Sequence, residues 1–196
     1  MIHFDPVPEP PGFDEEVRQP GNAWLQQHPD TERPRDFWSP FKPHLEAGFR
    51  KLCGYTAMLT TDGTVDHYLS CKNYPELTYE WRNYRFVSPR INSSKQDVDD
   101  RVLDPFQVTD GWFEILLPSL QLVMTDAVPA DECERATFTL ERLHLRDGET
   151  VIRQRREWYK RYEQGEMPLE LLDKFAPLIA RAVRKQMEAE VDGTHH

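Results

Sequence analysis

The chain of 196 residues is 38% hydrophobic and 11% aromatic, which suits one domain with a buried core and excludes disorder throughout. No apolar run approaches the roughly 18 residues of a membrane span, the N-terminus lacks the features of a secretory signal, and three cysteines form no even disulfide framework. Taken as a sum, the formal charge of −10 argues against binding nucleic acid, because phosphate repels an acidic protein, so the distribution of charge along the chain matters more. We therefore expect a cytoplasmic protein with no membrane partner.

Residues 1–40 form an arm that holds eight of the sixteen prolines. Because proline fixes φ and donates no hydrogen bond, we expect this arm to be extended and mostly irregular. Its apolar residues Phe13, Trp24 and Leu25 indicate that it packs on the domain.

Residues 41–100 are expected to form a compact centre. The spacing of Phe41, Leu45, Phe49 and Leu52 predicts a helix that Gly54 ends. Short strands are expected within residues 63–70 and over residues 84–87, and Pro89 is placed to begin a short helix that runs through Lys95.

Residues 101–196 contain a predicted β pair followed by helices. The pair comprises residues 112–117 and 121–124. Apolar spacing then predicts helices over residues 136–143, 151–162 and 171–183, with a break near Pro177. The expected fold class is α+β, with the arm, the centre and this last segment in one globule.

The central segment also carries the candidate chemistry. Asp66 and His67 are neighbours on a predicted strand, so they face one site only if the strand ends or bends there. A histidine can act as a general base near neutral pH, and a carboxylate with an amide such as Asn92 suits Mg²⁺, which retains water and shares substrate phosphate. Together these groups describe a phosphodiesterase site.

The same segment is the basic part of the chain. Residues 41–96 hold eight basic and five acidic residues, and no acid falls between Arg82 and Lys95. Charge and proximity make Arg85, Arg90 and Lys95 candidates for phosphate contacts. A solvated face is the alternative interpretation of this charge run.

Each candidate residue taken alone has an ordinary structural interpretation. A lone histidine is more often structural than catalytic, Asn83 and Asn92 could be turn or cap residues, and Trp81 could belong to the core. The joint order and spacing favour a functional site.

Four blocks in this order resemble the HNH, or ββα-metal, endonuclease superfamily, closest to a bacterial branch associated with phage defence. The branch pattern runs C-x-Y-C, E/D-H-F, Y-x-W-x-N and C-x-x-C-N-x-x-K. This sequence supplies Cys53-Gly-Tyr55, Val65-Asp66-His67-Tyr68, Tyr79-Glu-Trp81-Arg-Asn83 and Asn92-Ser-Ser-Lys95.

The resemblance implies a ββα-metal centre and a nuclease that acts on DNA, with RNA as the alternative substrate. It implies that Asp66 and Asn92 ligate Mg²⁺ or Mn²⁺, that His67 is the general base, and that Asn83 braces the loop and orients the histidine. A protein partner, such as an ATPase encoded nearby, is a further expectation.

The sequence departs from the family at its zinc cysteines. The four positions align with Cys53, Thr56, Ser88 and Ile91, so we expect no structural zinc and apolar packing in its place. A non-catalytic, HNH-derived module that binds nucleic acid or protein is the alternative function, and an accidental motif match is a third interpretation. The terminal His195 and His196 are not taken as a metal site.

Overall fold

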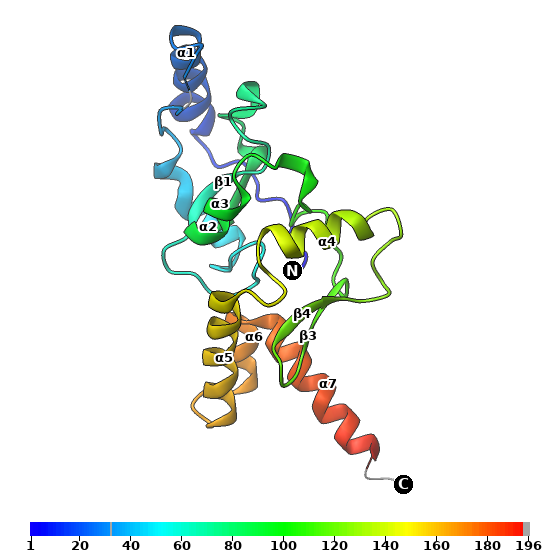
Figure 1. Ribbon diagram of the computed structural model, residues 1–196. Coiled ribbons are helices and arrows are strands. Elements are labelled where there is room, and N and C mark those ends of the chain that lie inside the picture. The colour runs from blue at the N-terminus through cyan, green and yellow to red at the C-terminus, as the bar shows by residue number, and fades with distance from the viewer. Residues whose placement is uncertain (32, 194–196) are drawn as a thin grey trace.

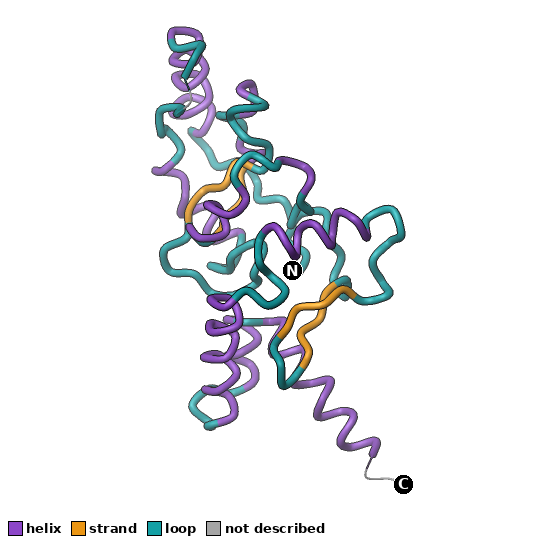
Figure 2. The backbone as a smooth tube through the Cα atoms, in the orientation of Figure 1, coloured by secondary structure: helices purple, strands orange, loops and turns teal. Residues whose placement is uncertain are grey.

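The structure is a computed structural model that describes residues 1–31 and 33–193, so the terminal histidines lie outside the described residues (Figure 1). Its architecture is α+β, as predicted. Helices surround two small antiparallel sheets, one pairing β1 with β2 and the other β3 with β4 (Figure 2). One hydrophobic cluster contains residues from the N-terminal segment, the centre and the C-terminal helices.

The N-terminal arm is irregular only at its two ends. A wide π-helical turn, Asp14–Arg18, leads directly into α1, Gln19–Gln27, so the prediction of a mostly irregular arm is wrong for this stretch. In this turn the Gln19 N–H donates to the Asp14 carbonyl, five residues earlier. The next residue, Pro20, has no N–H to donate, so the wider turn lies where the helix lacks one backbone hydrogen bond. The fully buried side chains of Phe13 and Val17 fasten the helix to the core.

The central unit runs strand, strand, helix. A 3-10 turn, Ser39–Phe41, and α2, Lys42–Gly48, precede β1, Thr64–His67; β2, Tyr84–Val87, and α3, Pro89–Lys95, follow. The register pairs Asp66 with Arg85 and His67 with Tyr84. Two further 3-10 turns, Pro75–Leu77 and Trp81–Asn83, shape the connection between the strands.

Helix α2 ends at Gly48, earlier than the predicted end near Gly54. Arg50 and Lys51 adopt positive φ angles of 55° and 61°, which an α-helix cannot continue through. Gly48 itself lies against the N-terminal arm, where an added Cβ would come within 2.4 Å of Val7.

The C-terminal half follows the predicted order. After a 3-10 turn, Asp99–Arg101, come β3, Phe113–Leu116, β4, Gln121–Met124, α4, Cys133–Arg142, and α5, Glu149–Glu163. The predicted break at Pro177 is confirmed, because it separates α6, Leu169–Phe175, from α7, Pro177–Gly193. None of the helices in the described ranges has both the length and the apolar character that crossing a bilayer requires.

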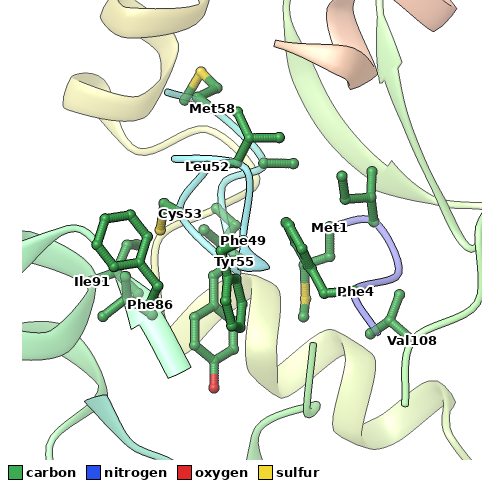
Figure 3. Packing of buried hydrophobic residues seen from close by; sticks show 14 of the residues in the cluster. Met1, Phe4, Phe49, Leu52, Cys53, Tyr55, Met58, Phe86, Ile91 and Val108 are labelled. Carbon is green, nitrogen blue, oxygen red and sulfur yellow. The ribbon is translucent and has the colours of Figure 1, made fainter. Parts of the chain in front are cut away.

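Three of the four positions that the resemblance aligns with zinc ligands lie in the protein interior. Cys53, Thr56 and Ile91 are buried, and Ser88 is partly exposed. Figure 3 shows Cys53 and Ile91 within the apolar cluster beside Phe86. The Gly54 N–H also bonds the Phe86 carbonyl at 2.9 Å. Apolar packing and one backbone bond therefore join the turn after Cys53 to the ββα unit.

This packing predicts a measurable role for Ile91. Replacing Ile91 by Ala should lower the free energy of unfolding by about 2–5 kcal/mol, because it leaves a cavity between α3 and the turn after Cys53. Ser93→Ala, at an exposed position of the same helix, is the matched control and should change it by less than about 0.5 kcal/mol. Urea unfolding measures the free energy of unfolding of both variants. A loss for Ile91→Ala as small as that for Ser93→Ala would contradict the role of Ile91 in packing.

Candidate functional site

His67 lies at the end of β1 with its ring fixed on three sides. The ring contacts Trp38 and Tyr84 edge-on, with centroids 4.7 and 4.9 Å away, and its Nε2 lies 2.8 Å from the Thr78 carbonyl oxygen. Because a carbonyl oxygen only accepts, Nε2 carries the ring proton and Nδ1 keeps its lone pair. Burial lowers the pKa of His67 to about 4, so the imidazole is neutral near pH 7.

Asn83 holds the loop that supplies this carbonyl. Its Nδ2 donates to the Leu69 and Leu77 carbonyls at 2.8 and 3.1 Å, and its Oδ1 accepts from the Leu69 N–H at 2.8 Å. Both ends of residues 69–77 are thus fastened to one buried amide, and Thr78 follows directly. Asn83 therefore positions the group that orients His67.

His67 and Asn92 line the same surface hollow, of about 540 Å³. One wall comes from the end of the N-terminal arm, including Trp38, and from Lys42 at the start of α2, whose Nζ donates to the Gly63 carbonyl at 3.0 Å. Sequence reasoning missed this wall, since the spacing of these residues gives no signal that they meet β1. A second hollow continues past Asn92 along α3.

Asp66 takes no part in lining the hollow of His67. Its side chain is 2% exposed, and Oδ1 accepts from Lys95 Nζ at 3.1 Å. Its Oδ2 is buried with no hydrogen-bond partner among the described residues. Burial raises the pKa of Asp66, and the Lys95 ammonium partly opposes that shift.

The arrangement does not fit the expected divalent cation. Mg²⁺ requires several oxygen ligands, usually with one or two carboxylates, at a site open to water. Asn92 lines the hollow, whereas the single carboxylate expected there is buried and paired with an ammonium. Within residues 1–31 and 33–193, no group of three or more His, Cys, Asp or Glu side chains is placed to hold a metal ion.

Two of the three expected phosphate contacts are wrong. Arg85 is buried and donates to both carboxylate oxygens of Asp104, at 2.7 and 2.6 Å, while its guanidinium lies 3.8 Å from the centroid of the Phe106 ring. Lys95 is fully buried and paired with Asp66. Arg90 alone of the three is exposed, on the outer face of α3.

Comparison with known proteins indicates no family or function for this chain. No protein-family model matches the chain, and no curated protein is detectably similar to it in sequence.

The lowered pKa of His67 predicts how stability depends on pH. The unfolded histidine titrates near 6.5 and the folded one near 4, so the unfolded chain binds more protons between these values. Stability from this residue is present above pH 6.5 and falls by about 2–3 kcal/mol as the pH drops to 4. Chemical unfolding of wild type and His67→Gln at several pH values measures the difference. Parallel stability curves for the two proteins would contradict the assignment.

Proposed function

We propose that the protein hydrolyses phosphodiester bonds in nucleic acid, with DNA as the first substrate class and RNA as the second. The observation that carries the proposal is the neutral imidazole of His67, held in one tautomer at a hollow it shares with Asn92. The order β1, β2, α3, with these residues at the end of β1 and on α3, is the order that the HNH resemblance implies.

In this proposal His67 Nδ1 accepts a proton from water, and the water oxygen bonds to phosphorus. The bond from phosphorus to the 3′-oxygen breaks, the 3′-oxygen takes a proton from solvent water to give a 3′-hydroxyl, and the other end carries the 5′-phosphate. Asn83 acts as a positioning residue through the loop and Thr78. The Asn92 amide lines the hollow together with the basic side chains of Arg33 and Lys42, and all three suit phosphate oxygens. Arg90 is exposed on the same helix as Asn92 and remains the candidate that charge alone suggests.

The resemblance implies Mg²⁺ or Mn²⁺ at Asp66 and Asn92, where such an ion would stabilise charge on the phosphate. No step is assigned to it, because Asp66 is paired with Lys95 and does not line the hollow.

A second candidate is a non-catalytic module that binds nucleic acid or protein. The buried Asp66–Lys95 pair favours it, since that pair removes the one carboxylate expected to act at the site. The acidic flanks of the chain favour a protein partner, such as an ATPase encoded nearby, that recruits the protein to nucleic acid. A cytoplasmic role in bacterial defence belongs to the nuclease proposal.

The decisive test compares His67→Ala with wild type in nicking of plasmid DNA. Loss of a general base should lower the cleavage rate by about 10² to 10⁴-fold and leave DNA affinity nearly unchanged, because the imidazole acts on water in the transition state. His44→Ala, at an exposed histidine of α2, is the matched control and should cleave like wild type. Equal rates for wild type and His67→Ala would contradict the catalytic role and leave the binding module.

Arg90 tests the nucleic-acid contact separately. Arg90→Glu should weaken binding to DNA of any sequence and reduce the salt dependence of binding, because it removes a phosphate contact. Arg156→Glu, an equal charge reversal at an exposed position of α5, is the control. Fluorescence anisotropy at several salt concentrations measures both, and equal losses would place the contact elsewhere.

A further inference from the structure

We propose that the ammonium of Lys95, and not a divalent metal ion, is the resident cation of Asp66. This inference concerns the same site as the proposed function. Its experiments measure metal binding and thermal stability and not DNA cleavage, so the inference and the proposed function can fail separately.

All three hydrogen-bond donors of the Lys95 ammonium have partners. It donates to three oxygens, Asp66 Oδ1 at 3.1 Å and the carbonyls of His67 and Tyr68 at 2.8 and 2.9 Å. An ammonium has three donors, so none is left over for a phosphate or another ligand. Lys95 has no exposed surface, and its Nζ also lies 5.8 Å from the centroid of the Tyr68 ring.

The same contacts remove Asp66 from metal chemistry. A divalent ion at Asp66 would lie within a few ångströms of the Lys95 charge, and repulsion there is strong because both side chains are buried away from water. Moving Lys95 away would leave its ammonium and two carbonyl oxygens without their partners in the interior, which is costly. The fold therefore favours the ammonium over Mg²⁺ or Mn²⁺ at this carboxylate.

The register of the ββα unit explains why this lysine reaches Asp66. Asp66 and His67 point to opposite faces of β1, so the carboxylate faces the interior when the imidazole lines the hollow. Lys95 lies in the last turn of α3, which packs on β1 and buries Lys95 together with Ile91. One helix thus supplies both the apolar contact and the counter-ion.

The first experiment measures Mn²⁺ binding to wild type and to Asp66→Asn by water proton relaxation. We expect the two proteins to show the same weak binding at millimolar Mn²⁺. A stoichiometric, tighter Mn²⁺ site in wild type that is lost in Asp66→Asn would overturn the proposal, whether or not the protein cleaves DNA. If Asp66→Asn fails to fold, the wild-type measurement decides alone. A tight, stoichiometric Mn²⁺ site overturns the proposal, and weak binding at millimolar Mn²⁺ supports it.

The second experiment tests the pairing by thermal unfolding of Lys95→Met and of the double variant Asp66→Asn/Lys95→Met. Lys95→Met leaves Asp66 buried without a counter-ion and should lower Tm by roughly 6–20 °C. The double variant removes both charges and should be more stable than Lys95→Met. A Lys95→Met protein at least as stable as the double variant would overturn the pairing.

Discussion

A buried ammonium that binds three oxygens at the end of β1 is the contact on which the site depends. Lys95 joins the last turn of α3 to Asp66 and to the carbonyls of His67 and Tyr68, and so fixes the helix on the strand. Desolvating a carboxylate and an ammonium costs several kcal/mol, and only full use of the three donors offsets that cost. Together with the packing of Ile91, this contact holds α3 on β1 and so helps to place Asn92 at the hollow of His67.

Side chains alternate between the two faces of β1, so its neighbours Asp66 and His67 have different surroundings and different roles. Asp66 faces the interior and pairs with Lys95, while His67 lines the hollow with its Nε2 bound to the Thr78 carbonyl. Arg85, opposite Asp66 in the register, repeats the pattern by pairing with Asp104 in the interior. Two of the eight basic residues of the central segment thus pair with internal carboxylates, while Arg50, Lys51, Lys72, Arg82 and Arg90 are exposed.

Local signals predicted much of the fold, and tertiary pairing explains what they missed. The strand at 84–87 and the helix from Pro89 through Lys95 follow from apolar content and a proline suited to a first helical turn, and both are confirmed. The helical stretch over residues 14–27 was not predicted, because the proline-rich composition of the arm indicated irregular chain, although its one proline, Pro20, follows a wider π-helical turn. The run of bases from Arg82 to Lys95 suggested a surface, but Lys95 pairs with a residue 29 positions away and Arg85 with one 19 positions away. Spacing along the chain does not encode such pairs.

A crystal structure of the wild-type protein grown in millimolar Mn²⁺, with anomalous data, tests the account most directly. We expect no anomalous peak at Asp66, and we expect Lys95 Nζ within about 3 Å of the Asp66, His67 and Tyr68 oxygens. His67 Nε2 should lie within hydrogen-bond distance of the Thr78 carbonyl oxygen. A Mn²⁺ peak bound by Asp66 and Asn92, with Lys95 turned out of the interior, would contradict it.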